Sequence, residues 1–388
     1  MLSKLSDIRR SASLLNRKRK AWQAQLPMRA AMPLFRHRIT KPAHIRRVLF
    51  VHTSGGTGDA LYVLGMVRRL AAHGVEASIC TLSKHVPLLT RSGLFQHVFE
   101  LGSSGSLPGS FDAAVDLEYV NANHWQLRTA VLKHVHCWRI TTGPVMKDMP
   151  LYDEFIDYST FRHVSMRFGL VCSRLLDENV VTRIMPFVPV DTAAEEEADS
   201  FLKTLTGYRN IVYLNARAGD EDRFFSKTQT LAMLRVLSTM PETAVVVFPP
   251  DNDFADYCFA PNIVPLPDMS FPAFGSFVRR CAWVVTTDTS ATHVAAAFDR
   301  PCLTFFPPND RDYFIQYGAW EAWGSLSTVS ETVHPDDAAL AIDRFGRANL
   351  PTLDAAAIPV ETLTTAIRHF ARRLGFDLSD PTQSTTPA

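Results

Sequence analysis

The feature that most constrains the fold is a short apolar run followed by a glycine-rich loop and a helix pattern. Residues 48–51 (Val-Leu-Phe-Val) are uninterruptedly apolar, as expected of a strand buried on both faces of a parallel sheet. Residues 52–59 form the loop, residues 60–72 have apolar side chains at helical spacing, and Gly74 is placed to end that helix. With a second strand pattern at 76–81, the segment is one β–loop–α–β unit, which predicts a parallel sheet.

The same alternation recurs along the chain. The first half also predicts a helix at 84–92 and strands near 98–99 and at 113–117, whereas 121–165 is predicted to be irregular, with loops and short helices over a cleft. After a proline-containing and then acidic segment (186–199), strands are expected at 211–214, 244–248, 283–287 and 302–306, and helices at 228–239, 270–281, 289–298, 335–345 and 359–374. We therefore predict an α/β protein with two tandem, doubly wound, Rossmann-like domains that face each other across a cleft.

The length of 388 residues suits two domains, each large enough to bury a core. We expect a basic N-terminal extension at 1–46, an N-terminal domain at 47–190, a C-terminal domain at 191–346, and a C-terminal helix and tail at 347–388.

The near-neutral net charge of +1 hides an uneven distribution. Residues 1–47 hold 13 Lys and Arg and a single acid, Asp7, whereas the rest of the chain is acidic. Because the positive charge is confined to an extension, we expect no nucleic-acid partner. Residues 1–46 are either an amphipathic helix for an anionic membrane surface or a solvated basic tail.

Neither a membrane span nor a secretion signal is expected. No stretch approaches the roughly 18 apolar residues that a spanning helix needs, and the leucines at 14–15 are followed, after Asn16, by four basic residues. The six cysteines form no C-x-x-C pair, which predicts reduced and mostly buried thiols. We expect a cytoplasmic protein, with peripheral attachment to the inner membrane as the alternative.

The first loop, with Ser54, Gly55, Gly56, Thr57, Gly58 and Asp59, combines glycines with an acid at a helix start. It lacks the Gly-Lys-Ser/Thr ending of a phosphate-binding P-loop, and an aspartate at a helix N-terminus would repel phosphate. The glycines would let a sugar approach closely, with Asp59 as a general base. The alternative role for Asp59 is an ordinary helix N-cap.

The loop at 286–293 follows a buried strand and opens a helix of small residues. Free N–H groups at that helix N-terminus, together with nearby hydroxyls, would bind a diphosphate. The alternative is an ordinary capped helix in which His293 is a core histidine. The candidate donor-binding residues here are Asp288, Thr289, Ser290, Thr292 and His293.

The loop at 215–226 supplies two arginines, Arg217 and Arg223, which could bind phosphate as guanidinium forks or pair with neighbouring acids. Asp251 lies in an Asp-Asn-Asp sequence after a predicted strand, where a nucleotide ribose or base is expected. Since no cluster has convincing metal-ligand spacing, no metal or cofactor is expected.

Two segments resemble the bacterial ADP-heptose:lipopolysaccharide heptosyltransferases, glycosyltransferase family 9. The first is 48–70, with its Thr-Ser-Gly-Gly-Thr-Gly-Asp sequence. The second and more specific is 287–310, with Asp-Thr-Ser-Ala-Thr-His-Val-Ala-Ala-Ala followed by Pro301. The resemblance covers roughly 47–345 and is weak between 119 and 205.

The resemblance implies a GT-B fold and an inverting, metal-independent glycosyltransferase that uses a nucleotide-diphospho-sugar, with ADP-heptose expected, and a glycan or lipid-linked acceptor. It assigns the general base to Asp59 and stabilisation of the leaving diphosphate to Arg223 and the segment from Asp288 to His293. The sequence departs from the family at Gly65, at Ala291 and at Pro307. Those departures leave a second possibility, a catalytically silent scaffold that binds a glycan or a protein partner.

Overall fold

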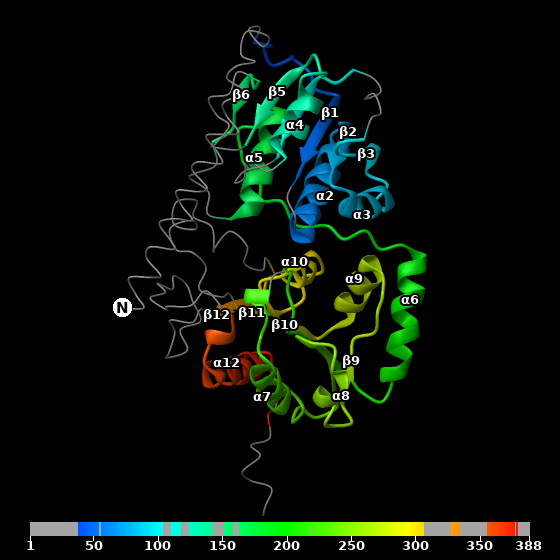
Figure 1. Ribbon diagram of the computed structural model, residues 1–388, viewed down its shortest axis with the longest axis vertical. Helices are drawn as coiled ribbons and strands as arrows, with labels where there is room; N and C mark the ends of the chain where they lie inside the picture. Colours follow the sequence, from blue (N-terminus) through cyan, green and yellow to red (C-terminus); the bar gives the residue numbers. More distant parts are fainter. Residues whose placement is uncertain are drawn as a thin grey trace, which may run out of the picture. The chain divides into compact units, whose positions relative to one another are not determined.

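The computed structural model describes residues 38–53, 56–103, 110–117, 124–142, 151–157, 163–219, 221–305, 327–333, 355–376 and 378. The chain divides into two compact units, and Figure 1 shows strands and helices in each of them. The first unit comprises Met1–Phe161 and Ser165–Ile184, and the second comprises Arg162–Val164 and Met185–Ala388.

The first unit is built on a six-stranded parallel sheet with the strand order β3-β2-β1-β4-β5-β6. The strands are β1 (Arg47–His52), β2 (Glu76–Thr81), β3 (Phe95–Glu100), β4 (Ala113–Asp116), β5 (Trp138–Thr141) and β6 (Glu154–Phe155). The helices are α2 (Thr57–Ala72), η2 (Ser83–His85), α3 (Val86–Arg91), α4 (Trp125–Leu132) and α5 (Val164–Leu176).

The second unit repeats this topology, with a parallel sheet in the order β12-β11-β10-β7-β8-β9. Its strands are β7 (Asn210–Asn215), β8 (Thr243–Phe248), β9 (Ile263–Pro265), β10 (Trp283–Thr287), β11 (Cys302–Phe305) and β12 (Ser330–Val333). Its helices are α6 (Thr192–Leu202), η4 (Lys203–Leu205), η5 (Glu221–Arg223), α7 (Lys227–Leu237), α8 (Phe254–Tyr257), α9 (Phe271–Arg280), α10 (Ser290–Ala297), η7 (Ala355–Ala357) and α12 (Val360–Arg373). Counted within each unit, both sheets have the order 3-2-1-4-5-6, so the predicted pair of doubly wound Rossmann-like sheets is confirmed.

The central strand of the second unit shows why helices cover both faces of the sheet. Successive side chains of a strand point to opposite faces. The Tyr213 ring packs edge-on against Phe277 of α9, with ring centroids 5.6 Å apart. Its neighbours Val212 and Leu214 belong instead to the core that includes Met233 of α7 and Phe370 of α12.

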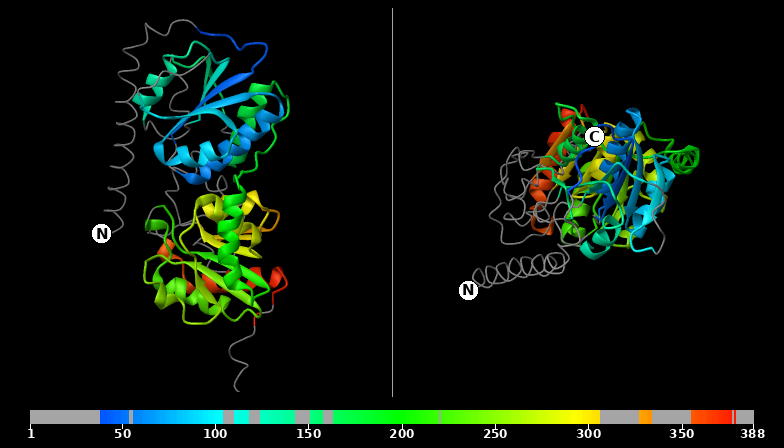
Figure 2. Two further views of the ribbon diagram at one scale, coloured as in Figure 1. Left: turned by 90° about the vertical axis from the view of Figure 1, so that its right-hand side faces the viewer. Right: turned by 90° about the horizontal axis from the view of Figure 1, so that it is seen from above.

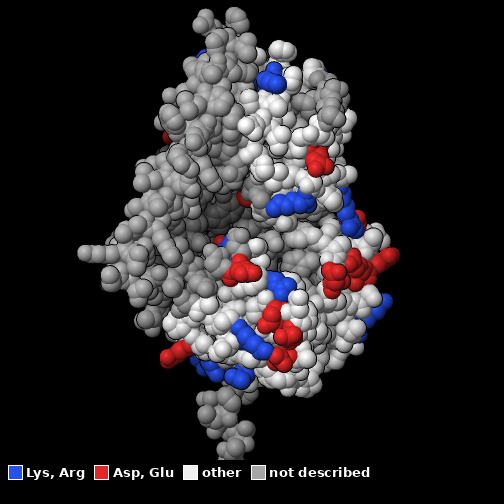
Figure 3. Space-filling view, viewed as in Figure 1, with Lys and Arg blue, Asp and Glu red and all other residues white. Residues whose placement is uncertain are grey.

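Helix packing follows the same two layers. Helix α6 packs on α9, and α12 packs on α7; Figure 2 shows α6 alongside the helices of the second unit. On the face in Figure 3, the Lys and Arg side chains of this unit are interspersed with Asp and Glu. The unit also contains the ion pair Arg279–Glu195, at 2.6 Å.

The predicted strands at 48–51, 76–81, 113–117, 244–248, 283–287 and 302–306 are confirmed to within a residue or two, and so is the helix end at Gly74, which has a φ of 76°. All six cysteines are free, and five are buried. Burial raises the pKa of the Cys80, Cys137 and Cys172 thiols to about 12. Residues 1–37 and the predicted helix at 335–345 lie outside the described residues.

The prediction of loops and short helices over 121–165 was wrong in part, because α4 is a short helix but β5 and β6 are strands of the sheet. Strand β5 contains Arg139, whose charge disguises the strand pattern, yet its side chain is buried and pairs with Asp153 at 3.2 Å. The acidic segment was also misjudged, because α6 begins within it. Asp191 caps that helix by accepting a bond from the Ala194 N–H at 2.9 Å, and only small side chains, Ala194 and Ala198, are buried.

Candidate active site

In each sheet there is one pair of adjacent strands whose following connections run toward opposite edges of the sheet. The carboxyl ends of these two strands lie side by side. Ligands of doubly wound folds bind at such switch points. In the first unit the position lies between β1 and β4, and in the second between β7 and β10. The three loops singled out from the sequence follow β1, β7 and β10, so the fold places each of them at a switch point.

Asp59 lies in the first turn of α2, after β1, and its residue is 7% exposed. The helix begins at Thr57 and its N-cap is Gly56, with no side-chain cap. The alternative interpretation of Asp59 as the N-cap is therefore wrong. Thr57 and Gly58 belong to the same first turn, whereas Ser54 and Gly55 lie outside the described residues.

Gly56 approaches the Asp59 carboxylate closely. A Cβ added at Gly56 would lie 3.1 Å from Asp59 Oδ2, tighter than most real contacts of that kind. The backbone at Gly56 is extended, with a φ of −85°, so the requirement for glycine comes from space and not from backbone conformation. A side chain at position 56 would therefore press on the carboxylate and require it to shift by a few tenths of an ångström.

His52, the last residue of β1, is a buried polar residue that sequence reasoning missed. Its side chain is 1% exposed, its Nδ1 lies 3.4 Å from Thr81 Oγ1, and its ring centroid is 5.4 Å from that of His85. Burial, followed by the positive charge of neighbouring His85 and Arg167, lowers the pKa of His52 to about 3. His52 is therefore neutral at physiological pH.

The other strand end at this switch point carries a buried ion pair that was also missed. Asp116 ends β4 and accepts bonds from Arg128 Nε at 3.0 Å and Nη2 at 2.5 Å, with both side chains fully buried. Tyr152 also donates to Asp116 Oδ2. The sequence signal that could have indicated Asp116 is its position directly after the apolar run 113–115. Its partners lie in the stretch predicted to be irregular.

In the second unit, Asn215 connects the ends of two strands. Its Nδ2 donates to Thr286 Oγ1 at 3.1 Å and to Thr289 Oγ1 at 2.9 Å. Thr289 is the N-cap of α10 and accepts a bond from the Ala291 N–H at 3.1 Å. The side chain that ends β7 thus fixes the N-terminus of the candidate diphosphate helix. The sequence signal that could have indicated Asn215 is its position at the end of a predicted strand.

Arg223 ends η5 and faces the same helix terminus. Its Nη1 lies 3.3 Å from both the backbone oxygen and the Oδ2 of Asp288, and its own carbonyl accepts a bond from Thr287 Oγ1 at 2.8 Å. The side chains are 29% and 19% exposed for Arg223 and Asp288, so the pair is half-buried and open to solvent on one side. The structure therefore brings these two predicted residues together.

The remaining residues of this segment divide into two groups. Ser290, the first residue of α10, is half-buried, whereas Thr292 and His293 are almost completely buried. Burial lowers the pKa of His293 to about 3, so this imidazole can offer a hydrogen bond but no charge at physiological pH.

Arg217 is held against the loop that follows β8. Its Nε and Nη2 donate to the Pro250 carbonyl at 3.2 and 3.1 Å, and Nη2 also donates to Asn252 Oδ1 at 3.1 Å. In the same loop, Asp251 Oδ2 accepts a bond from the Tyr257 hydroxyl at 2.8 Å. Arg217 and Asp251 thus both make hydrogen bonds at the loop after β8, at the carboxyl edge of the sheet.

Among the described residues, no three His, Cys, Asp or Glu side chains are grouped as metal ligands would be. Nor does this part of the chain contain a helix that combines the length and apolarity needed to cross a bilayer.

Comparison with known proteins agrees with this geometry. The model of "Glycosyltransferase family 9 (heptosyltransferase)" matches residues 255–332, which include β10 and α10. No curated protein matches. A family 9 glycosyltransferase from Veillonella parvula is similar in structure, with a TM-score of 0.65 at 11% identity, over 86% of this chain and 100% of that one.

Two Escherichia coli structures are also similar. Heptosyltransferase WaaC with ADP has a TM-score of 0.57 at 15% identity, over 85% of this chain and 98% of that one. ADP-heptose LPS heptosyltransferase II has a TM-score of 0.58 at 12% identity, over 84% and 99%. The fold is thus that of the two-sheet GT-B glycosyltransferases. Within that fold, residues 255–332 match the family 9 model.

Proposed function

We propose that this glycosyltransferase moves a heptose-like sugar from a nucleotide-diphospho-sugar, ADP-heptose first among candidates, to a glycan or lipopolysaccharide-core acceptor. The observation that carries the proposal is the half-buried Arg223 beside the N-terminus of α10. Helix α10 lies in the segment that the family model matches, whereas Arg223 comes from the loop after β7. The WaaC structure, named above, holds ADP, which supports an adenosine diphosphate donor.

The donor half of the mechanism follows from the charges of the second unit. Departure of the diphosphate places negative charge on the leaving oxygens. Arg223 and the α10 N-terminus would stabilise that charge, because a guanidinium and free backbone N–H groups are both anion donors. The Ser290 N–H makes no hydrogen bond to any described residue and is available to a phosphate oxygen. Arg217 and Asp251, held at the loop after β8, would contact the nucleoside.

The acceptor half is assigned to the first unit. Asp59 would remove the proton from the acceptor hydroxyl as that oxygen attacks the anomeric carbon on the face opposite the diphosphate. The result is inversion through an oxocarbenium-like transition state. The proton ends on Asp59, the new glycosidic bond replaces the sugar–phosphate bond, and nucleoside diphosphate leaves. No metal is invoked at any step.

The basic extension at 1–46 suits attachment to the anionic face of a membrane, where a lipid-linked acceptor would be presented. We include peripheral attachment on the cytoplasmic side of the inner membrane in the proposal.

A panel of nucleotide-diphospho-sugars tests the activity. The full chain is incubated with each donor and an envelope-glycan extract, and nucleoside diphosphate and glycosylated product are followed by mass spectrometry. We expect transfer from ADP-heptose, together with thermal stabilisation by ADP. Stabilisation by ADP with no transfer from any donor would favour the catalytically silent scaffold, while absence of both would refute the proposal.

A further inference from the structure

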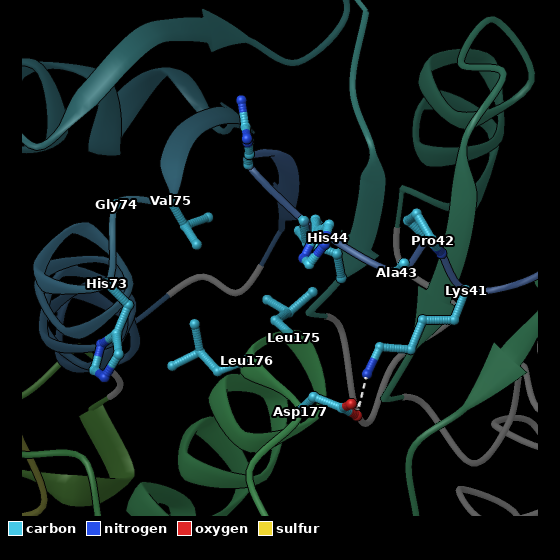
Figure 4. Close-up of a pocket in the computed structure, with 12 residues that line it drawn as sticks. Lys41, Pro42, Ala43, His44, His73, Gly74, Val75, Leu175, Leu176 and Asp177 are labelled. Atoms are coloured by element: carbon cyan, nitrogen blue, oxygen red, sulfur yellow. Dashed lines mark hydrogen bonds and ion pairs between the residues drawn. The ribbon is translucent and has the colours of Figure 1, made fainter.

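The first unit contains a pocket that is separate from the candidate active site. It has a volume of about 360 Å³ and lies between the chain segment entering β1, the turn entering β2 and the end of α5. Figure 4 shows Lys41 and Asp177 on one side, His73 on the other, and His44 and Leu175 between them. Its size falls within the range of small-ligand sites.

This pocket lies at the opposite edge of the sheet from Asp59. Its lining residues directly precede Arg47 and Glu76, the first residues of two parallel strands. Strand β1 then runs for six residues to His52 at the carboxyl edge. At about 3.3 Å per residue the two edges are about 20 Å apart, so a ligand here would not occupy the acceptor loop.

The acidic groups at this pocket are already neutralised. Asp177 Oδ1 pairs with Lys41 Nζ at 2.6 Å, and Glu178 Oε2, the next residue, pairs with Arg69 Nη2 at 2.7 Å. The carbonyl end of α2 is capped, because His73 Nδ1 donates to the Arg69 oxygen at 3.0 Å. The pocket therefore presents little uncompensated negative charge to a ligand.

Its uncompensated positive group is Arg46. The Arg46 backbone is fixed on both sides, since its N–H donates to Asp112 Oδ2 at 2.7 Å and its carbonyl accepts a bond from the Glu76 N–H at 2.7 Å. The guanidinium, however, is exposed and makes no hydrogen bond or ion pair with any described residue. The same holds for the exposed imidazole of His44. An anchored backbone with a free cationic side chain is well placed to bind an anion.

The position of the pocket along the chain indicates where that anion comes from. Residues 41–46 directly continue the N-terminal extension, which holds nine Lys and Arg and one acid in residues 1–37. An anionic membrane surface that attracts the extension would therefore meet this edge of the first unit.

We propose that this pocket binds the phosphate headgroup of an anionic phospholipid, with Arg46 as the principal contact and His44 as a second donor. The site would orient the first unit on the membrane by its amino edge. The inference extends the membrane role proposed for residues 1–46, but it does not depend on sugar transfer or on Asp59.

Vesicle co-sedimentation of the full chain tests the proposal. Phosphatidylcholine vesicles with and without phosphatidylglycerol are compared for the wild type, Arg46→Gln and Arg46→Lys. Arg46→Gln should bind the phosphatidylglycerol vesicles about fivefold more weakly, the effect of losing one arginine near an anionic surface, whereas Arg46→Lys should retain most of the binding. The matched control is Arg235→Gln, which removes another exposed charge, from α7 in the second unit, and should bind like the wild type.

Equal binding by Arg46→Gln and Arg235→Gln would overturn the site. Calorimetry with inorganic phosphate distinguishes the source of the anion. Tight binding of free phosphate that is lost in Arg46→Gln would overturn the lipid assignment. A full-length variant with Gln at positions 17–20 separates the extension from the pocket, because Arg46→Gln should weaken vesicle binding in that background too.

Discussion

Replacing Arg223 with methionine should weaken the binding of ADP without unfolding the second unit. Methionine keeps the length and apolar stem of arginine but removes the guanidinium. The half-buried Arg223 pairs with Asp288 at 3.3 Å, and its local backbone is held independently by the bond from Thr287 to the Arg223 carbonyl. The substitution should therefore lower the affinity for ADP and leave the stability of the second unit nearly unchanged.

The magnitude follows from two opposing terms. A guanidinium–phosphate hydrogen bond contributes about 1.5–3 kcal/mol. The partly exposed pair with Asp288, which the diphosphate must displace or share, is worth up to about 1 kcal/mol. The net loss in Arg223→Met is then about 1–2 kcal/mol, which corresponds to about a 5–30-fold increase in the Kd for ADP.

Isothermal titration calorimetry of the full chain with ADP measures this change without knowledge of the acceptor. Arg209→Met is the matched control, because Arg209 is exposed and precedes β7 at the amino edge of the same sheet. It should bind ADP like the wild type. If Arg223→Met binds ADP within twofold of the wild type, the diphosphate does not contact this arginine and the donor site is misassigned.

Three further results are expected. Gly56→Ala should lower turnover about tenfold, because the new Cβ displaces the Asp59 carboxylate, while the free energy of unfolding falls by no more than about 1 kcal/mol. The neutral control in the kinetic assay is Gly207→Ala, because a Cβ added at Gly207 has no atom within 4 Å. Arg128→Met should cost about 3–5 kcal/mol in denaturant unfolding, since it leaves a fully buried carboxylate uncompensated; a loss below 1 kcal/mol would contradict that account. The folded-state pKa of His52, about 3, lies below its unfolded value of 6.5, so its contribution to stability is present above pH 6.5 and is lost as the pH falls toward 3. In His52→Gln, the free energy of unfolding should depend less on pH between 6.5 and 3. An unchanged pH dependence would contradict this role of His52.

The sequence was sufficient for the fold because the apolar strands and the loops after them are local patterns. Residues 48–51 and 244–247 are buried on both faces of their sheets, and such strands appear as continuous apolar runs. The loops after β1, β7 and β10 could be placed at one edge from strand direction alone. Their positions at the switch points are what made Asp59, Arg223 and the α10 segment candidates.

Long-range pairing could not be predicted in the same way. Strand β5 was missed because Arg139 is neutralised by Asp153, 14 residues away. Asp116 was not recognised as a site residue because its partner Arg128 lies in a stretch where the sequence indicated short helices without locating them. Asn215 was passed over because its role depends on Thr289, 74 residues further along. In each case a polar group is buried because a distant side chain satisfies it.

The most direct measurement for the central claim is the turnover of Asp59→Asn set beside its affinity for ADP. Asparagine keeps the shape of the side chain but cannot accept the acceptor's proton. The account predicts a loss of about 10²–10⁴-fold in kcat with ADP affinity unchanged. Asp191→Asn, which removes a helix-capping carboxylate elsewhere, should keep its turnover. Wild-type turnover in Asp59→Asn would contradict the account.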